Sequence, residues 1–429
     1  MTQIGISAGD EPLALLERRI RQESAPVAPR YVFWMLITFL VLEYARPPGI
    51  VLLRLQFLIS LLIPILWLTS RERLWPPVLT LQALFLVWCA KSVPFAHNYF
   101  AVYVTTRTLY GIVSISLALI WVGSRLGDFK RILWVWVAVM AYQGAWSVTH
   151  GGLGTGGFLG DENDLALACG TATPLALLGL EYLRGKGRWA CAVAVSILIA
   201  GIVASVSRGG FVGLVAGGLY CLWRSRHKAR ALAGLAAISL AILTLAPRQY
   251  LEEIKSIRET DEGTARGRRF LWEAARNMWW DHPVTGVGAG NVRYLIGQYQ
   301  PTDFEEREYQ ERNWSGTTVH SLYFQLLAEQ GSVGVGLVVL LLWNHLRTLR
   351  RLVRDVRRSP AAPDALRRDT ELYAFALNGA IVGYLSAGAF LSAAYYPYLW
   401  YLTALSTALD MSVRRELTGI RAGAPPMPA

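Results

Sequence analysis

Long apolar stretches alternate with short polar breaks along most of the chain. Many of them hold about 20 residues, the length that an α-helix needs to cross the core of a bilayer. The twelve stretches are residues 31–42, 50–69, 74–90, 100–122, 132–149, 164–183, 189–206, 209–223, 231–246, 321–343, 372–393 and 396–411. The pattern predicts an all-α polytopic membrane protein with about 12 transmembrane helices.

The longest polar stretch lies between the ninth and tenth predicted helices. We expect a cytoplasmic N-terminal segment at 1–30, helices in 31–246, a loop at 247–320, helices in 321–411 and a cytoplasmic tail at 412–429. The first thirty residues lack the apolar core of a signal peptide, so the first helix is expected to direct insertion.

The large loop is polar but rich in aromatic residues, and we expect it to fold. Two helices are predicted in it, at 248–258 and 268–280. In the second, one face carries only small or apolar side chains, Leu271, Ala274, Ala275 and Met278. An amphipathic helix of this kind is expected to lie on the membrane surface.

Basic residues fall on alternate loops. One set of loops and termini holds 27 Lys and Arg residues, eight of them between Arg347 and Arg368, whereas the opposite short loops hold Arg46, Lys91 and Arg208. Because cytoplasmic loops are enriched in Lys and Arg, both termini are assigned to the cytoplasm and residues 247–320 to the periplasm. Residues 347–368 are predicted to form a solvated connector beside anionic lipid headgroups.

Composition agrees with this topology. The chain of 429 residues is 53% hydrophobic and 17% charged. Its net charge of +12 follows from the cytoplasmic loops, so no nucleic-acid partner is expected. The four cysteines all lie in apolar stretches without metal-ligand or disulfide spacing.

A few arginine and histidine residues lie in or beside the apolar stretches and are candidates for binding or catalysis. Arg54 and Arg107 lie inside apolar stretches and Arg208 at the outer end of one, where an arginine faces either a polar cavity or the headgroups. His320 precedes the tenth helix, whose dipole disfavours imidazolium and so favours a neutral general base. The alternative for His320 is an ordinary surface residue. His97, His150 and His282 are weaker outer-side candidates.

Common catalytic and cofactor motifs are missing. The run Gly286, Gly288 and Gly290 has the spacing of a phosphate loop, but without a preceding strand it favours a tight turn or close helix packing. Asp161 and Asp164 are the nearest carboxylate pair, and a metal role is not favoured for them. We therefore expect no metal and no cofactor.

Three stretches, taken in order, resemble signatures of the O-antigen ligase and O-antigen polymerase family of bacterial membrane glycosyltransferases. The first is the sequence 207–210, similar to an SRG signature. The second is similar to a GR-x3-W segment with a later Pro and G-x-G, here Gly267, Arg268, Trp272, Pro283, Gly286 and Gly288. The third is similar to an H-N/S-x-Y-x3-L-x-E-x-G-x2-G signature, here His320, Ser321, Tyr323, Leu327, Glu329, Gly331 and Gly334. The resemblance covers residues 160–340 best.

The resemblance implies transfer of a glycan from undecaprenyl pyrophosphate to a glycan or glycolipid acceptor, at the periplasmic face of the bacterial inner membrane. It implies His320 as the catalytic base and Arg208 and Arg268 as the clamp for the diphosphate. Arg269, which leaves a one-residue ambiguity in the second motif, is a secondary substrate-binding candidate with Arg107, Asn163 and Asp164. Ser321 stands where Asn is commoner in the family.

Several readings stay open. The acceptor could be lipid A core, favoured here and implying a role in lipopolysaccharide biosynthesis, or another repeat unit, an exopolysaccharide or a protein side chain. These acceptors correspond to a ligase, a polymerase and an O-glycosyltransferase. A transporter of lipid-linked sugars would also need many helices, but it predicts an internal repeat that the sequence does not show convincingly. A non-catalytic scaffold for polysaccharide export is the third class.

Overall fold

The computed structural model describes residues 28–46, 54–70, 73–245, 248, 250, 252, 263–301 and 314–421. These residues form helices and loops, with no strand among them. The longer helices are α2 (Arg30–Tyr44), α3 (Leu55–Thr69), α4 (Pro77–Ala90), α5 (Tyr99–Gly123), α6 (Leu126–Thr149), α7 (Glu162–Tyr182), α8 (Lys186–Ala204), α9 (Arg208–Arg224), α10 (Lys228–Leu245), α12 (Gly263–Asp281), α15 (Leu322–Arg358), α16 (Asp364–Gly388) and α17 (Pro397–Arg421). Short helices are η2 (Gly157–Gly160), α13 (Val292–Leu295) and η4 (Ile296–Gln298).

Each of the twelve apolar stretches overlaps one helix. Among the described residues, five helices (α5, α6, α7, α8 and α15) can cross a membrane by length and composition, and α3 and α4 are shorter apolar helices. The all-helical fold class is confirmed, while the count of twelve spans stays a prediction.

The outer faces of the bundle are apolar. Large hydrophobic side chains are more than half exposed on separate helices, including Trp34 on α2, Val87 on α4, Trp189 on α8, Leu240 on α10 and Trp343 on α15. Exposure of such an apolar surface to water is unfavourable, whereas its contact with lipid tails is favourable. The chain is a multi-pass membrane protein.

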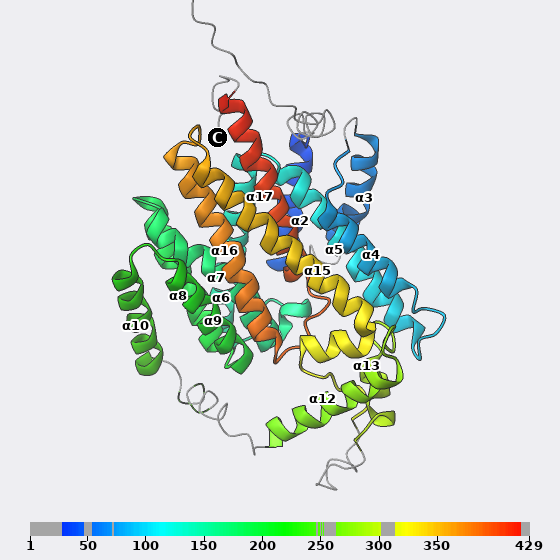
Figure 1. Cartoon of the computed structure of the whole chain (residues 1–429). Helices are drawn as coiled ribbons and strands as arrows, with labels where there is room; N and C mark the ends of the chain where they lie inside the picture. Colours follow the sequence, from blue (N-terminus) through cyan, green and yellow to red (C-terminus); the bar gives the residue numbers. More distant parts are fainter. Residues whose placement is uncertain are drawn as a thin grey trace, which may run out of the picture.

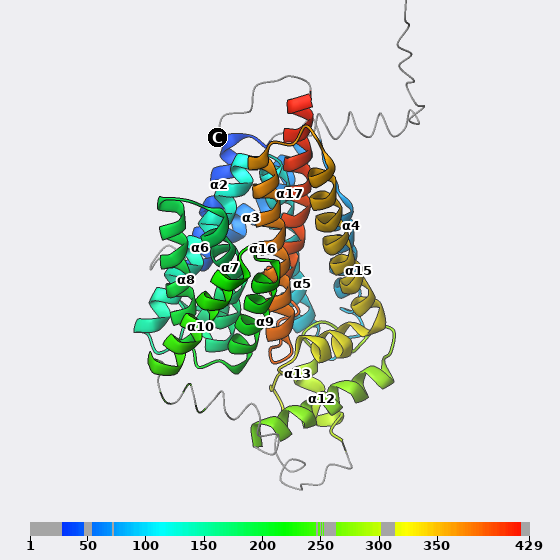
Figure 2. The same ribbon diagram turned by 60° about the vertical axis from the view of Figure 1, so that its left-hand side comes forward.

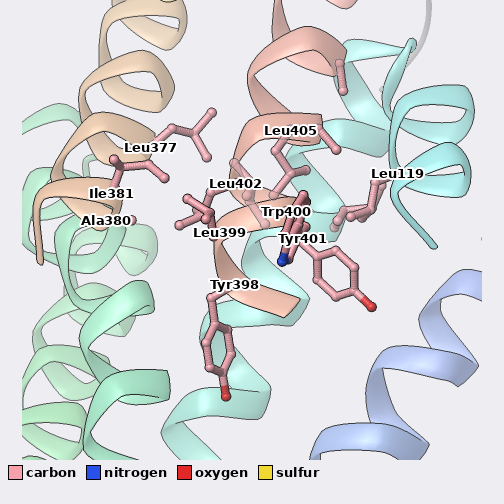
Figure 3. Packing of buried hydrophobic residues seen from close by; sticks show 14 of the residues in the cluster. Leu119, Leu377, Ala380, Ile381, Tyr398, Leu399, Trp400, Tyr401, Leu402 and Leu405 are labelled. Atoms are coloured by element: carbon pink, nitrogen blue, oxygen red, sulfur yellow. The ribbon is translucent and has the colours of Figure 1, made fainter. Parts of the chain in front are cut away.

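Helices α5, α16 and α17 enclose the centre of the bundle. Figure 3 shows Leu119 of α5 and Leu377 of α16 pointing toward Trp400 and Leu402 of α17. Trp400 is 1% exposed, and its ring lies 4.8 Å from that of Phe85 on α4. The C-terminal helices therefore hold the earlier ones together.

Helix α12 lies across one end of the bundle, while α17 ends at the other end (Figures 1 and 2). The predicted apolar face is confirmed, because Leu271, Ala274, Ala275 and Met278 are all buried. They pack in a small separate core with Val319 and Ala328. The other helix predicted in the loop, 248–258, lies almost entirely outside the described residues.

The basic connector predicted at 347–368 is wrong in its extent. Helix α15 continues to Arg358 and α16 begins at Asp364, which leaves a link of only a few residues. Leu349, Leu352, Val353 and Val356 are buried at helical spacing, so one face of this basic stretch packs on the bundle. In the same way, α17 extends to Arg421 into the predicted tail.

Charged side chains tie helices together far from α12. Arg357 of α15 donates to Glu371 of α16 at 2.8 Å, and Arg226, between α9 and α10, also bonds that carboxylate. Nearby in the fold, Lys130 of α6 lies 2.5 Å from Asp369 of α16. Basic loops that the sequence assigned to one side of the membrane thus meet at one end of α16.

Candidate functional site

The three motifs meet at the C-terminal end of α16. Gly209 lies so close to Phe390 that an added Cβ would sit 3.4 Å from the Phe390 Cβ. The Arg268 guanidinium lies 5.6 Å from the centroid of the same ring. The Tyr323 hydroxyl donates to the Leu385 carbonyl at 2.8 Å. One segment, 385–390, therefore touches all three motifs.

The first motif begins a helix. Ser207 is the N-cap of α9, and its hydroxyl accepts a bond from the Gly210 N–H at 3.0 Å. The same hydroxyl donates to the Asn163 side-chain oxygen at 2.7 Å, which ties α9 to the start of α7. Arg208 is the first residue of α9, so its guanidinium is based at the helix N-terminus, where anions bind favourably.

Val206, just before this motif, has φ +53°. A left-handed conformation is rare for a β-branched residue and costs about 1–3 kcal/mol. The other three described non-glycine residues of this kind are Arg46, Arg54 and His320. Strain of this sort gathers at functional sites, and here it lies directly before the SRG motif and at His320 itself.

The start of α7 carries the acidic candidates. Asp161 caps the helix, accepting from the backbone N–H groups of Asn163 at 2.8 Å and Asp164 at 3.4 Å. The Asp164 carboxylate accepts a short bond of 2.5 Å from the Tyr396 hydroxyl, in the loop between α16 and α17. Asn163 and Asp164 are thus placed by bonds to the same parts of the fold that hold the motifs.

His320 lies two residues before α15, and its side chain is partly exposed. Its Nε2 is 3.4 Å from the Thr318 Oγ1. The pKa of His320 is lowered, first by partial loss of water around the ring and second by the positive charge of Arg268, while the Asp161 carboxylate opposes this effect. The imidazole is therefore favoured in the neutral form that can accept a proton.

Trp272 of the second motif makes a hydrogen bond and a ring contact with residues around the third motif. The Trp272 indole N–H donates to the Val319 carbonyl at 3.0 Å, and its ring stacks on Phe324 with centroids 5.1 Å apart. Because Trp272 is one turn beyond Arg268 on α12, this contact sets the position of Arg268 relative to His320. The distances explain why a Trp follows the arginine at this spacing.

The glycine run packs against a helix. Gly331 breaks α15 with φ +61°, and the Gly288 N–H donates to the Glu329 carbonyl at 3.0 Å. An added Cβ on Gly286 would lie 2.4 Å from the Glu329 carbonyl carbon, and one on Gly331 would lie 2.4 Å from the Val284 carbonyl oxygen. The glycine run therefore packs closely against the backbone of α15. This agrees with the sequence context, which favoured a tight turn or close helix packing over a phosphate loop. Figure 1 shows the first turns of α15 lying crosswise to the rest of that helix.

Two predicted residues stand apart from this group. Arg107 lies on an exposed face of α5, with its guanidinium 4.3 Å from the Phe57 ring centroid on α3. Arg269 is exposed on α12, whereas its neighbour Arg268 is half-buried. Arg268 is the one of the two whose charge lowers the pKa of His320, and the choice between them for the motif stays a prediction.

Sequence reasoning missed several residues at this end. Phe390 and Tyr396 lie in a loop without any motif, and Asp161 was singled out only as one of a carboxylate pair. Asp161 caps α7, and its electrostatic effect on His320 needs the fold to be seen. Within the described ranges, no three His, Cys, Asp or Glu side chains gather as metal ligands would.

The fold and this site define a multi-pass membrane protein with its charged chemistry at one end of a helical bundle. Residues 193–349 match the family model described as O-antigen ligase. The family resemblance of the motifs is thereby confirmed, and the matched range contains Arg208, Arg268 and His320. In general terms this family supports a membrane glycosyltransferase. No curated protein matches the chain.

Proposed function

We propose that the protein transfers a glycan from undecaprenyl pyrophosphate to an acceptor at the periplasmic face of the bacterial inner membrane, with both termini in the cytoplasm. Lipid A core is the acceptor that we favour. The observation that carries this proposal is the meeting of the three motifs on segment 385–390, where the Arg268 guanidinium lies 5.6 Å from the Phe390 ring centroid and Gly209 packs on the same residue.

In the proposed reaction, Arg208 and Arg268 bind the diphosphate of the donor through permanently charged, bidentate donors. The acceptor hydroxyl gives its proton to His320 and attacks the sugar C1. The C1–O bond to the diphosphate breaks with inversion at C1, and undecaprenyl pyrophosphate leaves with its charge stabilised by the two arginines. These cations supply the role that a metal has in other transferases, so the mechanism is metal-independent.

The remaining candidates have supporting roles in this proposal. Asn163 orients the SRG motif through Ser207, and Asp164 holds the loop after α16 through Tyr396. Arg269, exposed beside Arg268, would contact the outer phosphate or lipid headgroups. Arg107, which stacks on Phe57, is the weakest candidate for donor contact.

The test is glycan transfer by the purified protein in nanodiscs, supplied with the lipid-linked donor and candidate acceptors. We expect His320→Ala to lower the rate by about 10²- to 10⁴-fold, the usual contribution of a general base. The matched control is His282→Ala, an exposed histidine at the end of α12. Unchanged transfer in His320→Ala would reject the general-base role.

The arginine clamp has its own control on the same helix. Arg268→Ala should raise the donor KM and lower kcat, whereas Arg276→Ala, at an exposed position of α12, should change neither. Full activity of Arg268→Ala would remove the proposed clamp. Activity that survives a chelator is expected, because the two arginines carry the charge stabilisation.

The choice of acceptor separates related functions. Consumption of lipid A core indicates a ligase, elongation of a lipid-linked repeat unit indicates a polymerase, and labelling of a protein side chain indicates an O-glycosyltransferase. Movement of the lipid-linked glycan between leaflets without any transfer would instead support a transporter.

A further inference from the structure

A cavity opens beside the proposed catalytic histidine. It encloses about 350 Å³, within the usual range for small-ligand pockets, between the first turns of α5, the glycine run and the loop after α16. Thr318 and Val319, directly before His320, form part of its wall. The donor motifs Arg208 and Arg268 do not line it.

One polar group in the cavity wall has no hydrogen-bond partner among the described residues. The Ser392 Oγ is buried and makes no hydrogen bond in the described part of the chain. A buried hydroxyl without a partner costs free energy, which a ligand hydroxyl in the cavity would offset. Gln325 also lines the cavity, and its side-chain oxygen is used by the Ala394 N–H at 3.1 Å, which fixes the direction of its amide.

The rim combines aromatic rings with one cation. Phe100 and Tyr294 are 62% and 39% exposed, which leaves ring faces available to the apolar face of a sugar. Arg293 is exposed and takes part in no ion pair among the described residues; one of its N–H groups donates to the Gly316 carbonyl at 3.2 Å. Its remaining donors fit a phosphate or carboxylate.

Glu329 is the one carboxylate among the described residues that line the cavity, and it is already engaged. It accepts from the Gly290 N–H at 2.9 Å and from the Tyr395 hydroxyl at 2.5 Å. These bonds hold the glycine run against α15 and leave the wall polar rather than open to a cation. The cavity therefore offers hydroxyl donors and acceptors in its depth and a positive charge at its rim.

We propose that this cavity, lined by Arg293, Thr318, Gln325 and Ser392, binds the acceptor as a sugar that carries an anionic substituent. This proposal rests on the proposed function, because the bound sugar would present a hydroxyl past Thr318 to the His320 Nε2, 3.4 Å from the Thr318 Oγ1. The donor diphosphate occupies the arginine side of His320 and the acceptor occupies the side of Thr318. Binding at two separate places fits a single displacement, in which both substrates are present at once.

The experiment measures KM for each substrate separately, with purified lipid A core as the acceptor. We expect Ser392→Ala to raise the acceptor KM by about 5-fold, equivalent to about 1 kcal/mol for one hydrogen bond. Arg293→Gln should raise it by about 10-fold or more with the phosphorylated acceptor and have little effect after chemical dephosphorylation of that acceptor. The donor KM should not change in either variant. Arg188→Gln, an exposed arginine at the start of α8, is the control.

A bulky residue provides a variant with little risk to folding. Val104 lines the cavity from α5 and is 44% exposed, so Val104→Trp can enter the cavity without disturbing the core. It should raise the acceptor KM, and native mass spectrometry should show weaker binding of the acceptor in the absence of donor.

The outcomes separate this proposal from the general function. Absence of transfer by the unaltered protein with every acceptor would reject the proposed function. Active enzyme whose acceptor KM is the same in Ser392→Ala, Arg293→Gln and Val104→Trp would overturn the acceptor site alone. Equal losses for phosphorylated and dephosphorylated acceptors in Arg293→Gln would overturn the anionic substituent.

Discussion

At the scale of single residues, partial burial is the largest cause of the lowered pKa of His320, and two charges of opposite sign add to it or oppose it. Arg268 lowers its pKa and Asp161 raises it, so each change has a definite sign. The base must be neutral, and kcat/KM should fall as the pH drops through the pKa of His320. Asp161→Asn keeps a good helix cap, and we expect it to move this acidic limb to lower pH. Arg268→Gln should move it to higher pH.

The pH profile of kcat/KM in both variants checks this prediction. A purely structural role of Asp161 would lower the rate at every pH without moving the limb. A limb that stays in place in both variants would show that His320 is not the group that titrates.

Ser207 joins two helices through one hydroxyl group. Ser207→Ala removes the N-cap bond to Gly210 and the bond to Asn163, and we expect a loss of about 1 kcal/mol of stability. Thermal unfolding in detergent measures the effect. Ser196→Ala, whose hydroxyl bonds only the carbonyl of Ala192 in its own helix, should leave Tm unchanged. Equal Tm values for the two variants would contradict the link between α7 and α9.

At the scale of elements, the site depends on the break in α15. Gly331→Ala would place a Cβ 2.4 Å from the Val284 carbonyl oxygen at a φ of +61°, so we expect a loss of stability above the roughly 1–3 kcal/mol of backbone strain alone. Gly336→Ala, in the same helix with open space around it, should be neutral or stabilising by up to about 1 kcal/mol. Thermal unfolding of the two variants tests the contrast. A Gly331→Ala protein as stable as Gly336→Ala would show that the glycine run does not need this break.

Sequence periodicity predicted the helices well because each is apolar on the side that lies in the bundle or the lipid. It predicted the buried face of α12 for the same reason. It could not predict that Phe390 lies under Arg268, because a contact between residues far apart in the chain leaves no periodic signal. The prediction from periodicity was wrong for the basic stretch at 347–358. The many arginines there indicated a solvated connector, although Leu349, Leu352 and Val356 are buried at helical spacing.

At the scale of the whole molecule, α16 separates two ends with different chemistry. Glu371, bonded to Arg226 and Arg357, lies 17 residues before Gly388, which corresponds to about 25 Å along a helix. We therefore expect the histidine end and the arginine-rich end to lie on opposite sides of the bilayer core. The excess of basic residues predicts a cytoplasmic location for the second end.

Single cysteines test this orientation. The native cysteines Cys89, Cys169, Cys191 and Cys221 are all buried, so they should react little with a membrane-impermeant maleimide. We expect Thr285→Cys, exposed after α12, to be labelled in cells with a permeabilised outer membrane. Ala229→Cys, exposed at the start of α10, should be labelled only after the inner membrane is opened. The reverse pattern would place His320 in the cytoplasm, away from any donor in the outer leaflet, and the proposed reaction would fail with it.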